Sequence, residues 1–154
     1  MDSSIAQLNT LHPKIRAIAL NAYNEAVAAT PKGAHPVITQ GLRSFAESEK
    51  LYQQGRTTPG PIVSKAKAGQ SWHNYGLALD FVLLVNGKQT WQVNTDWLTV
   101  VNIFKKHGFT WGGNFAGNFK DYPHLEIKLG YTLTQLTALY NAGKFIPGTT
   151  YLLI

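Results

Sequence analysis

The chain has 154 residues, of which 44% are hydrophobic, 12% aromatic and 14% charged, a composition typical of one folded domain that excludes a disordered segment. Cysteine is absent, which excludes a disulfide-stapled scaffold and means that any metal site must be built from His, Asp and Glu. The net charge of +6 indicates attraction to a polyanion and leaves open whether this is DNA, an anionic cell-wall polymer or a membrane surface.

Nine elements are predicted from the spacing of apolar residues, from caps and from turn residues. Apolar side chains every three or four residues predict helices, whereas alternating or wholly apolar runs predict strands. A capping box of Ser44 and Glu47 begins the second helix and places Arg43 immediately before it. In chain order we expect helix 12–29, strand 35–42, helix 44–55, strand 77–85, a second hairpin strand after the Asn86-Gly87 turn, a helix from 94 or 95 to 107, strands 109–111 and 124–128, and helix 132–142.

The order of these elements predicts an α+β fold with a small, mainly antiparallel sheet flanked by helices. Residues 77–85 are apolar on both faces, so this strand is expected to be central and buried. Residues 55–72 contain many glycines and prolines and predict a long loop, which in a compact domain is usually functional or disordered. No internal repeat or linker interrupts the chain, so we expect a single domain over residues 1–154.

The sequence also predicts where the protein is made. No stretch approaches the roughly 18 apolar residues of a membrane span. The opening segment MDSSIAQLNTLHPKIR lacks a basic region followed by an apolar one, so it is not expected to be a signal peptide. No nucleic-acid-binding motif accompanies the positive charge. We therefore expect a protein made in the cytoplasm, with no membrane insertion and no nucleic-acid partner.

Asp80 is unusual because every neighbour in the segment LALDFVLLV is apolar. A carboxylate on such a strand needs a cation or several hydrogen-bond donors to compensate its burial. His73 precedes it by seven residues, and alone this spacing is weak evidence for a pair of metal ligands. The alternative is a core histidine and an aspartate paired with Arg43 or with a lysine.

A second polar cluster is the segment DYPH at 121–124. Its proline favours an extended residue before it, so His124 is expected to begin a strand and Asp121 to lie in the preceding loop. A catalytic zinc site needs three nitrogen or oxygen ligands, an open position for water and a carboxylate beside that water. His73, Asp80 and His124 would supply the ligands. Asp121 would be the base, unless it is only a turn residue and His124 an exposed edge histidine.

The two clusters resemble the motifs of zinc peptidases related to D-Ala-D-Ala carboxypeptidases and dipeptidases. The string SWHNYGLALD fits the pattern Ser-x-His-x-x-Gly-x-Ala-x-Asp. The downstream Asp-x-Pro-His fits the second signature as it occurs in L-alanyl-D-glutamate endopeptidases, the lytic enzymes of phages and some bacteria. Carboxypeptidases more often have glutamate in place of Asp121. The similarity covers about residues 35–128 and includes GLRSFAESEKLYQQGRTTPGPIVSKAKAGQ and FKKHGFTWGGNF.

The resemblance implies roles for the polar residues of both motifs. His73, Asp80 and His124 would hold one zinc ion, although manganese or cobalt accepts the same ligands. Asp121 would activate the attacking water and later protonate the leaving amine. Arg43 matches an arginine that holds the substrate carbonyl or its developing oxyanion, with a plain ion pair to a carboxylate as the alternative.

Further candidates lie beside the motifs. Ser71 would bind substrate or orient a ligand, unless it only caps a turn. Glu126 shares the strand face of His124 and is either an alternative base or a partner of that histidine. Three more residues are expected to line the substrate groove, unless the aromatic ring beside Gly-Gly packs in the core: Gln70, Tyr75 and Trp111. Three histidines outside both motifs are expected to be structural: His12, His35 and His107.

The resemblance implies a monomeric endolysin that cuts the L-Ala-D-Glu amide of peptidoglycan stem peptides. A D-Ala-D-Ala carboxypeptidase or dipeptidase is the alternative with the same chemistry, and a catalytically silent wall-binding module is the alternative outside enzymes. Only about 25 residues follow the last motif, so no separate wall-binding domain is expected. Release to the periplasm is expected through a holin or an equivalent pore.

Overall fold

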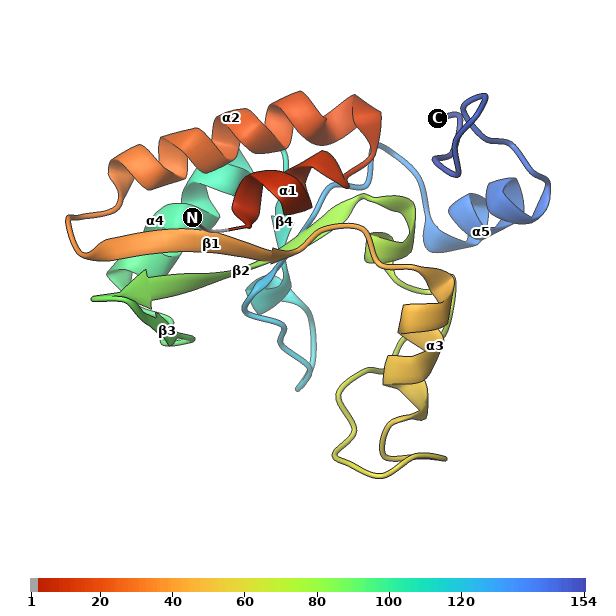
Figure 1. Ribbon diagram of the computed structural model, residues 1–154, viewed down its shortest axis with the longest axis horizontal. Helices are drawn as coiled ribbons and strands as arrows, with labels where there is room; N and C mark the ends of the chain where they lie inside the picture. Colours follow the sequence, from red (N-terminus) through yellow and green to blue (C-terminus); the bar gives the residue numbers. More distant parts are fainter. Residues whose placement is uncertain (1–2) are drawn as a thin grey trace.

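A five-stranded antiparallel sheet forms the centre of the structure (Figure 1). The computed structural model describes residues 3–154. The predictions of one domain over residues 1–154 and of a start without a signal peptide both include residues 1 and 2, which lie outside the described residues. The strand order is β1-β2-β5-β4, and β3 pairs with β2 as the second strand of a hairpin. All pairings between these strands are antiparallel, which confirms the predicted fold class. The strands are β1 (Ala34–Gln40), β2 (Ala78–Val85), β3 (Lys88–Thr90), β4 (Thr110–Trp111) and β5 (His124–Glu126).

Helices flank this sheet, as predicted. All nine expected elements are present, although β1 and β5 each end two residues before their predicted ends. The first helix and the two 3-10 helices were not predicted. None of the described helices is long and apolar enough to cross a membrane. The described helices are α1 (Ser4–Asn9), α2 (Pro13–Ala29), α3 (Phe45–Gln53), η1 (Trp72–Tyr75), α4 (Thr95–Lys106), η2 (Gly112–Asn114) and α5 (Leu133–Asn141).

Strand β2 has one face in the core and one face toward the candidate site. Leu79, Phe81 and Leu83 are fully buried and belong to the hydrophobic core that also contains residues of α2 and α4. Because side chains alternate along a strand, Asp80 points to the opposite face. His124 on β5 is the direct cross-strand neighbour of Asp80. The sheet register therefore brings these two polar side chains together on the face away from the core.

Two segments extend from the sheet on the side opposite α1 and α2 (Figure 1). One is α3 with the loop that follows it, and the other is the loop between η2 and β5. The Ser44 hydroxyl begins α3 by accepting a hydrogen bond from the Glu47 amide at 3.0 Å. Complete capping boxes, with both reciprocal bonds, occur instead at Ser71 and Thr132. The two extended segments form the walls beside the polar face of the sheet.

Candidate metal centre

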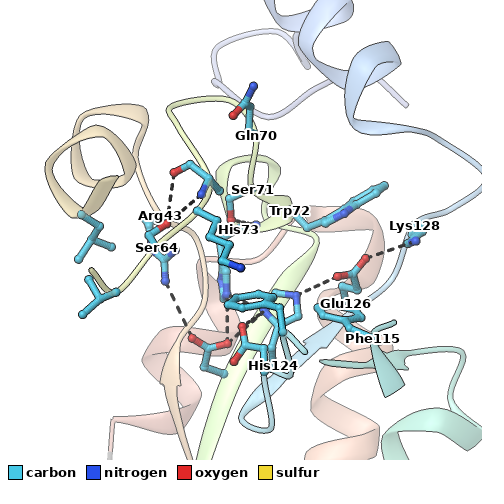
Figure 2. A pocket seen from close by; sticks show the side chains of 17 residues that line it. Arg43, Ser64, Gln70, Ser71, Trp72, His73, Phe115, His124, Glu126 and Lys128 are labelled. Carbon is cyan, nitrogen blue, oxygen red and sulfur yellow. Dashed lines mark hydrogen bonds and ion pairs between the residues drawn. The ribbon is translucent and has the colours of Figure 1, made fainter. Parts of the chain in front are cut away.

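Three side chains converge at the polar end of the sheet: His73 from η1, Asp80 from β2 and His124 from β5 (Figure 2). His73 Nε2 lies 3.1 Å from Asp80 Oδ1 and 3.2 Å from His124 Nδ1. His124 Nδ1 lies 3.3 Å from the same Asp80 oxygen. The structure therefore brings together the three residues that the sequence motifs predicted as metal ligands.

The spacing of these three atoms fits a metal ion. In a tetrahedral zinc site with bonds of about 2.0–2.1 Å, neighbouring ligand atoms lie about 3.3 Å apart. The sides of the observed triangle are 3.1, 3.2 and 3.3 Å. His73 and His124 are buried, whereas the Asp80 side chain is 23% exposed and lines a cleft. The triangle thus has the size of a zinc ligand set and is reached from the cleft.

Each imidazole is fixed through the ring nitrogen that faces away from the centre. His73 Nδ1 lies 2.8 Å from the carbonyl oxygen of Gly41, and His124 Nε2 lies 3.0 Å from Oε1 of the buried Glu126. Because both partners are acceptors, the neutral rings carry their hydrogens on these outer nitrogens. The two inner nitrogens and the Asp80 carboxylate then direct lone pairs at one another, an arrangement that requires a cation between them.

The electrostatics of the centre also favour positive charge. Burial by itself raises the pKa of Asp80, but hydrogen bonds with His124 and His73 outweigh it and hold this pKa well below its ordinary value. Burial lowers the pKa of His124, but its hydrogen bonds with Asp80 and Glu126 raise it to about 9. In the absence of metal a proton therefore supplies the positive charge, and a metal ion must displace it.

The segment around η1 presents His73 to the centre. The Ser71 hydroxyl accepts a hydrogen bond from the His73 amide at 3.2 Å and caps η1. Asn74 is buried and donates from Nδ2 to the carbonyl oxygen of Arg43 at 3.0 Å, which links η1 to the start of α3. Gly76 ends η1 with φ +69°, and a Cβ there would come 2.6 Å from a neighbouring backbone nitrogen. The turn that carries His73 thus explains why the motif has serine, asparagine and glycine at positions 71, 74 and 76.

The loop before β5 places Asp121 beside the centre. The Asp121 amide donates to the carbonyl oxygen of Gly112 at 3.1 Å, and a Cβ on this glycine would lie 2.2 Å from the Asp121 carbonyl oxygen. Trp111 Nε1 donates to the carbonyl oxygen of Tyr122 at 2.7 Å and supports the loop from behind. The His124 amide donates to the Asp121 carbonyl at 3.2 Å and closes the turn. The WGGN segment therefore positions the aspartate.

Besides Asp80, two carboxylates approach His124 from opposite sides. Asp121 Oδ2 lies 3.9 Å from Nδ1, the nitrogen that faces the centre, whereas Glu126 Oε1 bonds Nε2 on the outer side. Burial raises the pKa of Asp121, while the charge of His124 opposes this rise and the charge of Asp80 adds to it. Of the two carboxylates, Asp121 alone lies on the side of the metal position.

Arg43 lies at the rim of the centre. Its Nη2 lies 3.9 Å from Asp80 Oδ2, which is too far for a hydrogen bond. The ion pair with a carboxylate, which the sequence left open as the alternative role of Arg43, is therefore present at this distance. Its Nε is buried, and no described residue accepts a hydrogen bond from the guanidinium. The side chain is 15% exposed and lines the cleft. The Nη donors of Arg43 are therefore available to a ligand in the cleft.

The cleft around the centre has a volume of about 620 Å³. Ser71 and Gln70 line it, although Gln70 points away from His73 and His124 (Figure 2). Nine further lining residues were not identified from the sequence. The charged and aromatic ones among them are Lys65, Trp72, Phe115, Phe119 and Lys128. They come from three separate loops and from η1, so only the tertiary fold brings them together. For Trp72, its place next to His73 inside the first motif was an available signal.

Tyr75 and Trp111 do not line the cleft, contrary to the expectation from the sequence. Tyr75 is 3% exposed and its hydroxyl donates to the carbonyl oxygen of Gly69 at 2.7 Å. Trp111 is 8% exposed and makes the loop contact described above. Both rings face the core because their backbone positions direct them away from the polar face of the sheet. They support the walls of the cleft from behind.

The other three histidines lie outside the group of possible metal ligands among the described residues. His12 is buried, and its Nε2 lies 2.7 Å from the carbonyl oxygen of Leu152. His35 packs edge-on against the ring of Tyr23. His107 Nε2 lies 2.7 Å from a carboxylate oxygen of Glu25. Each therefore connects segments of the fold at a distance from the cleft.

Comparison with known proteins gives consistent matches. A family model of M15 peptidases, described as D-alanyl-D-alanine carboxypeptidase, matches residues 64–127. The chain is 48% identical over 126 residues to the peptidoglycan L-alanyl-D-glutamate endopeptidase CwlK of Bacillus subtilis (strain 168), a match that covers 76% of this chain and 73% of CwlK.

Two solved structures share the fold. The L-Ala D-Glu endopeptidase ChiX of Serratia marcescens superposes with a TM-score of 0.59 at 19% identity, over 87% of this chain and 90% of ChiX. The L,D-carboxypeptidase DacB of Streptococcus pneumoniae superposes with a TM-score of 0.53 at 21% identity, over 83% of this chain and 71% of DacB. At these identities the structural matches establish the fold alone.

Proposed function

Because the chain belongs to the D-alanyl-D-alanine carboxypeptidase family of M15 metallopeptidases, we propose that it is a zinc endopeptidase that hydrolyses the L-Ala-D-Glu amide of peptidoglycan stem peptides. The observation that carries this proposal is the triangle of His73, Asp80 and His124 with the Asp121 carboxylate on its cleft side. Three ligands and one adjacent carboxylate are the set that metal-assisted hydrolysis requires. The choice of bond rests on the similarity to CwlK.

Each residue of the centre has a chemical task in this proposal. When bound, zinc polarises the scissile carbonyl and makes a water molecule more acidic. Asp121, whose carboxylate lies on the side of the metal position, takes the proton of the attacking water and returns it to the leaving amine. Arg43 donates hydrogen bonds to the oxygen that gains negative charge. Ser71 orients His73 through its cap of η1.

A D-Ala-D-Ala carboxypeptidase or dipeptidase is the second candidate, because the matching family model carries that description. The same ligands and base serve both reactions, so the products distinguish them. The position of Asp121 disfavours a silent wall-binding module, since a module that only binds needs no base at the metal position. We further propose that the protein is a monomer that lyses the cell wall after release through a holin or an equivalent pore. A net charge of +6 is suited to this role, because it attracts the protein to an anionic wall polymer.

The deciding experiment is mass spectrometry of Gram-negative peptidoglycan digested by the zinc-loaded protein, beside a chelator-treated sample. The proposal expects free peptides that begin at D-Glu, and expects them to be absent with chelator. Released D-Ala would instead establish the carboxypeptidase. If protein with one equivalent of bound zinc cleaved nothing, both the endopeptidase and the carboxypeptidase activity would be excluded.

A further inference from the structure

The cleft carries more positive charge than its own carboxylates balance once a divalent ion is bound. Three basic side chains line it: Arg43, Lys65 and Lys128. Three acidic side chains line it as well: Asp80, Asp121 and Glu126. These six charges cancel, so a divalent ion leaves the lining with a net charge of about +2. Such a cleft favours a substrate that carries carboxylates near the bond to be cut.

None of the three cations donates a hydrogen bond to a described residue, and Lys128 is the one that lies beside Glu126, the partner of the predicted ligand His124. Arg43 is directed at Asp80, and the Lys65 ammonium lies over the ring of Phe119, 4.7 Å from its centroid. Lys128 Nζ lies 3.7 Å from Glu126 Oε2, beyond hydrogen-bond length. Its side chain is 52% exposed, and no described residue accepts a hydrogen bond from it. All three N–H groups therefore remain for a ligand.

Lys128 also has contacts that connect it to the metal centre. Glu126 is 2% exposed and uses its two oxygens differently: Oε1 bonds His124 and Oε2 faces the lysine. On its other side the ammonium lies 5.6 Å from the centroid of the Trp72 ring, the residue before His73 (Figure 2). A carboxylate bound by Lys128 would thus lie next to Trp72 and Glu126, the neighbours of the ligands His73 and His124.

We propose that Lys128 binds the free carboxylate of the D-Glu residue beside the scissile amide and makes the enzyme prefer this residue over its carboxamide form. The inference rests on the proposed function, because it concerns the substrate of the same cleft. In the stem peptide D-Glu is linked onward through its side-chain carboxyl, so its α-carboxylate is free and lies two bonds from the amide nitrogen. A lysine that binds this carboxylate favours D-Glu over its uncharged carboxamide, because only the carboxylate forms an ion pair with the ammonium.

The test compares two soluble peptides that differ only in this group, one with D-Glu and one with its α-carboxamide. Wild type is expected to cleave the carboxylate peptide with the higher kcat/KM. Lys128→Gln should lower kcat/KM for the carboxylate peptide by about tenfold, mainly through KM, and leave the carboxamide peptide unchanged. Lys128→Arg should keep the preference. Lys32→Gln, which removes the same charge at an exposed position outside the cleft, should behave as wild type.

Binding provides a second readout that needs no turnover. In the Asp121→Asn background, calorimetry should show the same preference for the carboxylate peptide and its loss with Lys128→Gln. Equal effects of Lys128→Gln on both peptides, or a wild type that cleaves both equally, would overturn the inference while the proposed function stands. A zinc-loaded wild type that cleaves neither peptide between L-Ala and D-Glu would overturn the proposed function, and the inference with it.

Discussion

The outer hydrogen bond of His124 decides which ring nitrogen can bind a metal. Glu126 accepts this bond at 3.0 Å and is buried, so water does not replace it readily. Outer partners of this kind typically contribute 10- to 100-fold in metal affinity. We expect Glu126→Leu to weaken zinc binding by about that factor, measured by competition with a chromophoric chelator, and Glu126→Gln to weaken it less because its amide oxygen still accepts the bond. Unchanged affinity in Glu126→Leu would show that packing alone orients the ring.

The position of Asp121 makes a separate prediction about turnover. Asp121→Ala should fold, bind zinc with wild-type affinity and lose about 10²- to 10⁴-fold in kcat, because proton transfer in the transition state is lost. Rates on a soluble stem peptide and zinc content after dialysis measure the two effects. Asp96→Ala, which removes an acid at the start of α4 outside the cleft, is the control. If Asp121→Ala remained active, the base would have to be sought elsewhere, and the position of Glu126 on the outer side of His124 disfavours the alternative base considered from the sequence.

At the scale of residues, the sequence predicted the metal ligands, because their positions follow from the spacing within the two motifs. His73, Asp80 and His124 meet because Asp80 and His124 are cross-strand neighbours and His73 lies on the turn before β2. The same motifs do not reveal which way an adjacent aromatic ring points. Tyr75 and Trp111 were therefore expected in the cleft and lie in the core. Lys128 was missed although the alternation that places Glu126 on the face of His124 also places Lys128 there in the predicted strand 124–128.

At the scale of elements, His12 connects the start of α2 to the C-terminal segment. Its Nδ1 accepts a hydrogen bond from the Lys14 amide at 3.1 Å and caps α2, while Nε2 donates to the carbonyl oxygen of Leu152. Only the neutral ring, with its hydrogen on Nε2, can make both bonds. Burial lowers the pKa of His12, the bond to Leu152 opposes this, and the charges of Lys14 and Arg16 add to the lowering.

This geometry predicts a pH-dependent stability. Because the folded-state pKa of His12 is lowered, its contribution to the free energy of unfolding is complete above the unfolded value of about 6.5 and is lost as pH falls below it. His12→Asn keeps a capping side chain but does not titrate. Urea unfolding in chelator should therefore show wild type more stable than His12→Asn at pH 7.5, with a smaller difference at pH 5. A difference that is the same at both pH values would exclude this titration.

Other elements show which helices the sequence could predict and which it could not. α2 and α4 were predicted because their apolar spacing extends over several turns. α1 has six residues and no side-chain cap, so neither length nor a start signal marks it. Yet α1 matters for the site, since Gln7 Oε1 accepts the amide hydrogen of Gly41 at 2.9 Å, and the Gly41 carbonyl fixes His73. Its role arises from tertiary contacts that the local sequence does not encode.

At the scale of the whole molecule, one metal ion would connect three separate elements. His73, Asp80 and His124 come from η1, β2 and β5, so binding should stabilise the folded state as a unit. Free zinc at a thousandfold excess over Kd is expected to add about 4 kcal/mol to the free energy of unfolding. Thermal unfolding should therefore occur at a clearly lower temperature after chelator treatment. The Asp80→Asn variant should show a much smaller shift, and an equal shift would place the stabilising metal at another site.

The net charge of +6 acts over longer distances than any contact in the cleft. Attraction to a polyanion is screened by salt, with a Debye length of about 10 Å at 0.1 M. We therefore expect added salt to slow the digestion of whole sacculi more than that of a short soluble stem peptide. Neutralising three exposed lysines outside the cleft should weaken this salt dependence on sacculi and leave the rate on the soluble peptide unchanged: Lys32→Gln, Lys88→Gln and Lys144→Gln. Equal slowing of both substrates in the wild type would remove the role of long-range attraction and leave charge recognition to the cleft.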